Sequence, residues 1–128
     1  MGRLTVPQTF TIPGTLPGMN DYTEACRANY RAGAAMKSKA EERIIWAIKS
    51  ARLKPVRGYP VTLHYTWYEK NQKRDKDNIS MAQKFVQDAL VKARIMPNDG
   101  WKEVEGFTHS FKVDKKNPRI EVTICEVN

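Results

Sequence analysis

Residues 61–90 read VTLHYTWYEKNQKRDKDNISMAQKFVQDAL, and the periodicity of apolar residues changes within this stretch. Residues 61–69 alternate and are rich in β-branched and aromatic side chains, which predicts a strand. One predicted face of this strand carries Val61, Leu63, Tyr65 and Trp67, and the other carries Thr62, His64, Thr66 and Tyr68. From about residue 78 to residue 94 the apolar residues recur at helical spacing. The stretch therefore predicts a strand that leads through a charged junction into an amphipathic helix.

The segments on either side predict the rest of a small α/β (α+β) fold. Residues 13–35 are rich in Gly, Pro and Asn, so we expect a functional loop with a helical turn or two within residues 22–30. The sequence also predicts a helix at 38–53, a turn at 97–100, and strands at 10–12, 103–113 and 119–127. We expect one compact domain over residues 1–128, with a mixed sheet of about four or more strands and two main helices.

The composition favours a polyanionic partner. Lys and Arg number 22 against 14 Asp and Glu, a balance of +8 that suits nucleic acid. No segment has the length and apolarity to span a bilayer, and residues 1–10 lack the apolar region of a signal peptide. We therefore expect a soluble cytoplasmic protein that does not bind membranes. In that setting Cys26 and Cys125 are expected to be reduced packing residues, and no zinc pattern occurs.

Two carboxylates interrupt the basic junction. Asp75 and Asp77 stand one residue apart, directly after Lys73 and Arg74. At 100° per residue, Lys84 and Asp88 fall on the same side of the predicted helix as Asp77, opposite its apolar stripe.

A purely structural interpretation covers part of this pattern, and the pattern alone slightly favours it. Asp77 or Asn78 would cap the helix, and Lys84 and Asp88 would form an exposed i,i+4 pair. Asp99 would be an ordinary residue of an Asn-Asp-Gly turn. This interpretation leaves Asp75 and the basic flank unexplained.

The functional interpretation is a magnesium site. Hard divalent cations prefer oxygen ligands, and magnesium usually takes one or two carboxylates together with water and phosphate. A calcium EF-hand loop is excluded, because Ile79 and Ser80 occupy the positions where it needs Asp or Asn and then Gly. The basic residues would attract a phosphate backbone. The cation would cancel the repulsion between carboxylate and phosphate and activate a water for attack.

The order of the motifs resembles a known family. RDKDN (74–78), QKFVQDALVKARI (83–95) and PNDGWKEVEGF (97–107) resemble the RusA family of Holliday junction resolvases, particularly its phage and prophage members. The resemblance extends to FTIPGTLPGMNDY (10–22) and NPRIEVTICE (117–126), and so covers most of the chain.

The resemblance implies a set of site residues. By position, Asp75, Asp77 and Asp99 match the catalytic carboxylates that hold the metal. Lys84 matches the essential lysine and would stabilise phosphate charge, although it lies three residues farther from Asp77 than in the best-known members. The residues that would contact the DNA backbone are Lys73, Arg74, Arg27 and Arg31.

The resemblance also implies an activity. We expect a homodimeric, magnesium-dependent endonuclease that binds four-way DNA junctions and makes paired symmetric nicks, in recombination, repair or phage DNA processing. Mn²⁺ is expected to substitute for Mg²⁺. Two alternatives stay open, a non-catalytic branched-DNA-binding protein and a metal-free protein-interaction module. His64 and His109 are interpreted as structural. An aromatic residue could wedge into a junction, but Trp67, Tyr68 and Trp101 are left out of the predicted site because aromatic residues in strands usually belong to the core.

Overall fold

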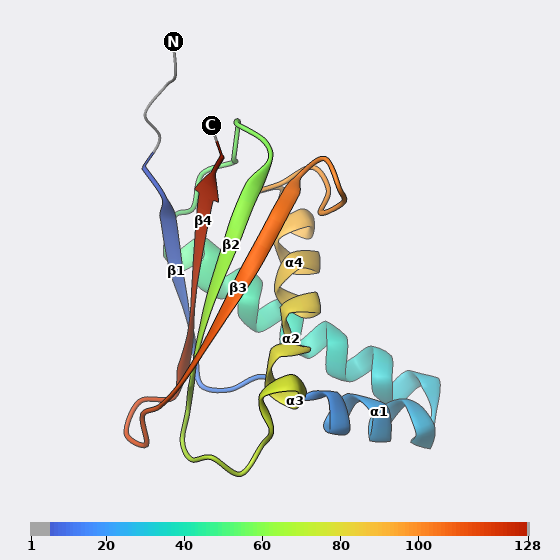
Figure 1. Cartoon of the computed structure of the whole chain (residues 1–128). Coiled ribbons are helices and arrows are strands. Elements are labelled where there is room, and N and C mark those ends of the chain that lie inside the picture. The colour runs from blue at the N-terminus through green and yellow to red at the C-terminus, as the bar shows by residue number, and fades with distance from the viewer. Residues whose placement is uncertain (1–5, 128) are drawn as a thin grey trace.

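The protein is described by a computed structural model that covers residues 6–127. Its four-stranded mixed sheet has the order β1-β4-β2-β3, in which β2 runs parallel to β3 and antiparallel to β4, and β1 runs antiparallel to β4 (Figure 1). The strands are β1 (Gln8–Pro13), β2 (Val61–Glu69), β3 (Val104–Val113) and β4 (Arg119–Glu126). The helices are α1 (Met19–Ala28), α2 (Tyr30–Ser50), α3 (Lys76–Ser80) and α4 (Gln83–Lys92). This α+β fold with a mixed sheet confirms the predicted class.

The core lies between one face of the sheet and helices α2 and α4, which lie on the same side of it in Figure 1. The buried face of β2 is the one that carries Val61, Leu63, Tyr65 and Trp67, and it continues to Glu69, which is also buried. The largest fully buried side chains include Trp67, Tyr65, Phe10, Phe85, Ile12, Ile44, Ile48, Leu63 and Leu90. The alternation in the sequence therefore divided the central strand into its two faces correctly, and the structure shows which of them is the core face.

The N-terminal half is more helical than predicted. α1 and α2 fill most of the segment that was expected to be a loop, and α2 begins at Tyr30 rather than at residue 38. Asn29 separates the two helices, and its side-chain oxygen accepts a hydrogen bond from the Ala32 amide at 2.8 Å. Asn is a favoured N-cap, and the alanines that follow favour helix.

The helix predicted over residues 78–94 is two helices. α3 ends at Ser80 and α4 begins at Gln83, with a turn at Met81 and Ala82 between them. The amides of Ala82 and Lys84 donate to carbonyls three residues back, at 3.3 and 3.1 Å, which is the tighter 3₁₀ type of turn. The segment between Asp77 and Lys84, which is longer than in the best-known members of the family that the sequence resembles, therefore contains a break between two helices.

The remaining sequence expectations concern thiols and membranes. Cys26 and Cys125 are free, but Cys26 is exposed on α1 and is not a core residue. Within residues 6–127, no helix has the length and apolarity required to cross a bilayer. Residues 1–5, on which the expectation of no signal peptide partly rests, lie outside the described residues.

Candidate active site

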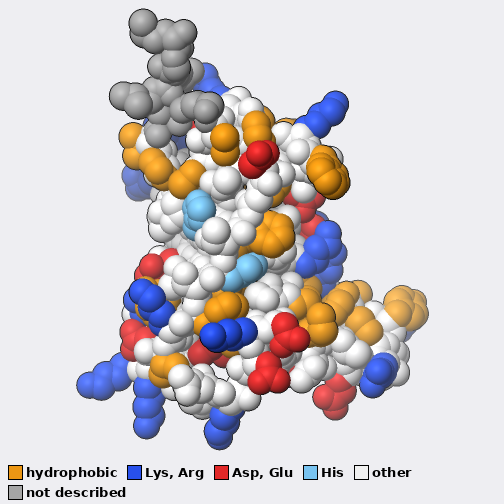
Figure 2. Space-filling view, in the orientation of Figure 1, with side chains coloured by type: hydrophobic (Ala, Val, Ile, Leu, Met, Phe, Trp, Pro, Cys, Tyr) orange, Lys and Arg blue, Asp and Glu red, His pale blue; other side chains and the backbone are white. Residues whose placement is uncertain are grey.

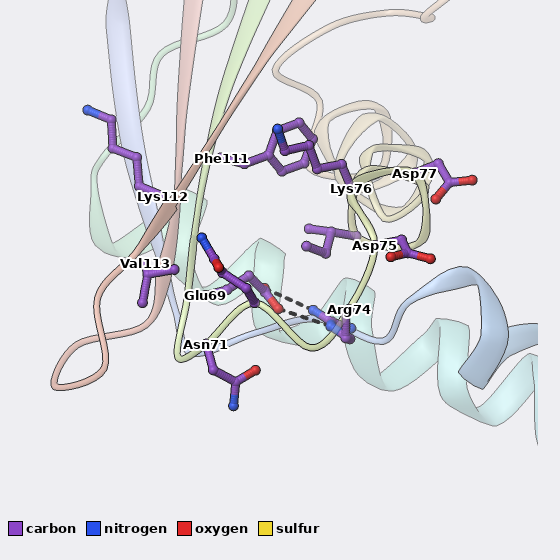
Figure 3. A pocket seen from close by; sticks show the side chains of 11 residues that line it. Glu69, Asn71, Arg74, Asp75, Lys76, Asp77, Phe111, Lys112 and Val113 are labelled. Atoms are coloured by element: carbon purple, nitrogen blue, oxygen red, sulfur yellow. Dashed lines mark hydrogen bonds and ion pairs between the residues drawn. The ribbon is translucent and has the colours of Figure 1, made fainter.

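A cavity of about 670 Å³ opens between the end of β3, the segment that follows β2, and helix α3 (Figure 3). Its lining combines acidic, basic and apolar side chains. The lining residues are Glu69, Asn71, Gln72, Arg74, Asp75, Lys76, Asp77, Ile79, Phe111, Lys112 and Val113. The charged junction singled out in the sequence is therefore one wall of a cavity.

Asp75 and Asp77 are exposed at the start of α3. Asp75 occupies the N-cap position, yet its side chain makes no capping hydrogen bond, and one Asp77 oxygen accepts the Asn78 amide at 2.9 Å. Within residues 6–127, neither carboxylate forms an ion pair with a Lys or Arg. In Figure 3 both carboxylates point away from Phe111. Their free oxygens face solvent, as a cation-binding pair requires.

Lys76 separates the two carboxylates in sequence and points the other way. Its amine lies over the Phe111 ring, 5.7 Å from the centroid, and Lys112 lines the same cavity (Figure 3). The sequence interpretation missed both lysines. The position of Lys76 between Asp75 and Asp77 was a signal that could have identified it.

Arg74 has an internal role that the sequence did not predict. Its Nε and Nη2 donate to the two oxygens of Glu69 at 3.0 and 2.9 Å, and its Nη1 donates to the Leu16 carbonyl at 3.0 Å. Asp21 lies 3.8 Å from Nη1. These contacts occupy much of the guanidinium and leave less of it for a phosphate. The sequence signal for this internal role of Arg74 is Glu69. Glu69 continues the buried face of β2, and a buried carboxylate needs a cationic partner.

Asn78 joins the carboxylate segment to the N-terminal part of the chain. Its side-chain oxygen accepts the Asn20 amide at 2.8 Å, at the start of α1. Gly18 packs so closely that an added Cβ would lie 2.6 Å from this oxygen. Asn78 and Gly18 therefore fix α3, and with it Asp75 and Asp77, against α1.

Asp99 is not among the residues that line the cavity beside Asp75 and Asp77. Its Oδ2 accepts from Gln87 Nε2 at 3.3 Å, and Gln87 Oε1 in turn accepts from the Tyr65 hydroxyl at 3.3 Å. Burial raises the pKa of Tyr65, and the charge of Asp99 adds to the increase, so Tyr65 remains a hydrogen-bond donor.

The arrangement of the carboxylates limits how many of them can hold one divalent cation. No group of three His, Cys, Asp or Glu side chains that could hold a metal occurs within residues 6–127. The structure therefore brings together Asp75 and Asp77 but not Asp99. Magnesium needs only one or two protein carboxylates, the rest of its shell being water and substrate phosphate, so this pair fits such a cation.

Lys84 is held by a carboxylate on its own helix. Its amine donates to Asp88 Oδ1 at 3.2 Å, and the other oxygen of Asp88 pairs with Lys37 of α2 at 3.0 Å. Burial would raise the pKa of Asp88, but the hydrogen bonds from Lys37 and Lys84 outweigh it and hold the pKa below its usual value. Asp88 therefore tethers Lys84 through the i,i+4 pair that the structural interpretation of the sequence predicted.

Most of the chain is similar in sequence to a known protein family. A sequence profile described as Endodeoxyribonuclease RusA matches residues 12–125. The chain belongs to the RusA family. The match supports a Holliday junction resolvase and includes Asp75, Asp77, Lys84 and Asp99. No curated protein matches the chain significantly.

The other predicted DNA contacts of this RusA-family protein lie in two places. Lys73 is exposed in the segment between β2 and α3, next to the cavity. Arg27 in the last turn of α1 and Arg31 in the first turn of α2 are exposed where these two helices meet, at the far end from β1 in Figure 1. Their contact with DNA stays a prediction.

The two histidines of the RusA-family protein are bonded to protein groups. The Trp67 indole donates to His109 Nδ1 at 2.9 Å, and burial lowers the pKa of His109. His64 bonds to the hydroxyls of Thr62 and Thr108 at 3.1 and 2.7 Å. These contacts agree with structural roles.

Proposed function

We propose that this RusA-family protein cleaves four-way DNA junctions in a divalent-cation-dependent reaction that nicks two strands symmetrically. The family is one of Holliday junction endonucleases. The proposal adds that the reaction depends on a divalent cation, that the nicks are paired, and which residues take part. The observation that carries the proposal is the pair of exposed carboxylates, Asp75 and Asp77. Within residues 6–127 neither of them forms an ion pair, although the chain has a net charge of +8.

Asp75 and Asp77 would hold the cation, Mg²⁺ in the cell with Mn²⁺ as a substitute, and Asp99 is proposed as a further carboxylate of the site. The cation would supply Lewis-acid polarisation of the scissile phosphate and would make water more acidic. Asp99 bonds to Gln87 in the structure. Its proposed contribution rests on the family resemblance and not on contact with the other two.

The residues around the carboxylates would position the substrate. Lys73, Lys76 and Lys112 at or beside the cavity would attract the DNA backbone, because ammonium groups neutralise phosphate charge. The Arg74–Glu69 pair holds the segment that ends at Asp75, so Asp75 sits on a fixed support. Lys84, tethered by Asp88, would present a cation to charge that develops on the phosphate.

Symmetric cleavage of two strands needs two sites, so we propose that the protein acts as a homodimer. We further propose that residues 1–128 form a single domain that acts in the cytoplasm, in DNA recombination, repair or phage DNA processing. The motivation is the family resemblance together with the single sheet shared by all four described strands.

One observation favours a second candidate, a branched-DNA-binding protein that does not cleave. Asp99 is not assembled with Asp75 and Asp77 in the structure, and loss of one carboxylate from the site would leave binding without catalysis.

A single assay separates the two functions. The protein is incubated with an end-labelled mobile four-way junction and with a linear duplex of the same sequence, in Mg²⁺ and in EDTA. Paired nicks at symmetric positions in the junction, only in Mg²⁺, are expected. Binding of the junction without cleavage in Mg²⁺ and in Mn²⁺ would establish the non-catalytic function. Absence of both would leave the metal-free protein-interaction module.

A further inference from the structure

Trp101 is the most exposed of the three tryptophans. Its side chain is 100% exposed, whereas Trp67 is 1% exposed in the core and Trp46 on α2 is 62% exposed. Tryptophan is large, and most of its surface is normally buried. An indole that makes no such packing contact is therefore available to a binding partner.

The turn that carries Trp101 is well anchored. The Gly100 amide donates to a carboxylate oxygen of Glu103 at 3.0 Å, and the amides of Glu103 and Val104 donate back to the Gly100 carbonyl at 3.1 and 3.0 Å. The Glu103 carbonyl accepts from the Val61 amide at 2.8 Å, at the start of β2. The exposed indole is therefore presented by a turn fixed to the central strand.

The same turn carries a residue of the proposed active site. Asp99 points inward to Gln87, whereas Trp101, two residues later, points to solvent. Two residues of chain span at most about 7 Å. A DNA strand whose phosphate approached Asp99 would therefore bring its neighbouring bases within reach of the Trp101 side chain. The adjacent Lys102 is exposed and can meet a phosphate.

We propose that Trp101 stacks on a nucleobase at the branch point of a DNA junction, while Lys102 contacts the backbone beside it. This inference rests on the proposed function and adds to it a cause of the preference for branched over linear DNA. Bases at a branch point can lose a stacking neighbour, whereas bases inside a duplex present no free face. Stacking on an aromatic side chain also suits every base, because each has a π-face.

Charge favours DNA over a second copy of the chain as the occupant. The chain as a whole carries +8, which attracts a polyanion and repels another basic molecule, and Lys102 stands next to the indole. The turn also carries Asp99 and Glu103, so the attraction comes from the whole chain and from Lys102. The test therefore also measures the oligomeric state of the Trp101→Ala variant.

The test compares Trp101→Ala with wild type, Trp101→Phe and Trp46→Ala, the last being the matched control for an exposed tryptophan elsewhere. Affinities for a four-way junction and for a linear duplex are measured in EDTA, and 2-aminopurine at the branch point reports stacking.

Trp101→Ala is expected to weaken junction binding roughly tenfold to hundredfold, the range that corresponds to loss of one base–aromatic stack, with duplex binding unchanged within about twofold. Trp101→Phe recovers part of the affinity and of the 2-aminopurine quenching. Trp46→Ala behaves as wild type.

A Trp101→Ala protein that keeps the wild-type ratio of junction to duplex affinity would overturn the stacking inference and leave the proposed function intact. A lower molecular mass of this variant by light scattering without DNA would also overturn it, because the indole would then contact a second copy. If the wild-type protein itself bound the junction no more tightly than the duplex, the proposed function would be refuted. The wild-type measurement therefore distinguishes failure of the proposed function from failure of the stacking inference.

Discussion

The Arg74 guanidinium binds the Glu69 carboxylate through two hydrogen bonds, Nε to Oε1 at 3.0 Å and Nη2 to Oε2 at 2.9 Å. The Glu69 side chain is only 9% exposed, so its charge depends on this partner. The pair also links the end of β2 to the residue that directly precedes Asp75. It thereby connects the stability of the fold to the position of the candidate active site.

Replacement of Arg74 should therefore lower stability. Arg74→Ala leaves a nearly buried carboxylate without its partner and should reduce the free energy of unfolding by about 3 kcal/mol. Arg74→Lys should be intermediate, since an ammonium cannot form the same two-pronged pair. Urea denaturation of both variants and of Glu69→Gln measures this. Equal stability of Arg74→Ala and wild type would show that the pair contributes nothing.

Lys84→Ala should impair cleavage much more than junction binding. Loss of one cation that meets developing phosphate charge lowers the rate by about a hundredfold or more. Binding should change little, because Lys73, Lys76 and Lys112 remain. Single-turnover cleavage is measured beside Lys84→Arg, which keeps the charge. Near-normal cleavage by the alanine variant would remove Lys84 from the site.

Asp88→Asn should reduce stability in a pH-dependent way. The pKa of Asp88 is lowered in the folded protein, so its ionised form stabilises the fold above the unfolded pKa, and this contribution is lost as pH falls through the folded pKa. Its partner Lys84 is 64% exposed, so the expected loss at neutral pH is about 0.5–1 kcal/mol. The difference between wild type and variant should be constant above about pH 5 and should shrink below about pH 4. A difference that does not vary with pH would show that Asp88 is not the titrating group.

The fold class and the central strand could be predicted because their signals are local. The alternation of residues 61–69 identified both faces of β2, and the apolar period identified α4. The turn at Met81 and Ala82 was missed because the helical period of apolar residues continues across it. The start of α2 lies before the amphipathic stripe, so apolar periodicity does not reveal it, and the local signal there is the cap residue Asn29.

The candidate site could be predicted only in part. Asp75 and Asp77 were identified from their spacing and surroundings, and the structure places both on one cavity wall. The bonds of Asp99 to Gln87 and of Asn78 to the start of α1 join residues that are distant in sequence. No periodicity encodes such contacts. The bond of Arg74 to Glu69 is not predicted either, because alternation alone does not show that Glu69 is a buried charge, and the contact of Arg74 with DNA stays a prediction.

Junction affinity should fall steeply with salt. Each phosphate neutralised by a lysine contributes about −0.9 to the slope of log affinity against log salt concentration. The double variant Lys76→Gln/Lys112→Gln should therefore reduce the magnitude of the slope by roughly 1.8. Lys39→Gln/Lys49→Gln, on the exposed side of α2, is the matched control and should keep the wild-type slope. A wild-type affinity that is independent of salt would contradict the electrostatic account.

The central claim is that Asp75 and Asp77 bind a catalytic divalent cation, with Asp99 as a further carboxylate of the site. Asp→Asn keeps the volume of each side chain and removes one negative ligand from a cation that prefers charged oxygens. Asn also serves nearly as well as Asp in a cap or a turn, so a structural role predicts little change. The substitution therefore separates the two interpretations.

The most direct measurement is single-turnover cleavage of a labelled four-way junction in Mg²⁺ by wild type, Asp75→Asn, Asp77→Asn and Asp99→Asn, with junction affinity measured in EDTA. Each variant should cleave about a hundredfold more slowly or not at all. Each should bind the junction as tightly as wild type or more tightly, since a charge that repels phosphate is gone. Cleavage at wild-type rate by all three folded variants would contradict the metal site and, with it, the assignment of these carboxylates to catalysis.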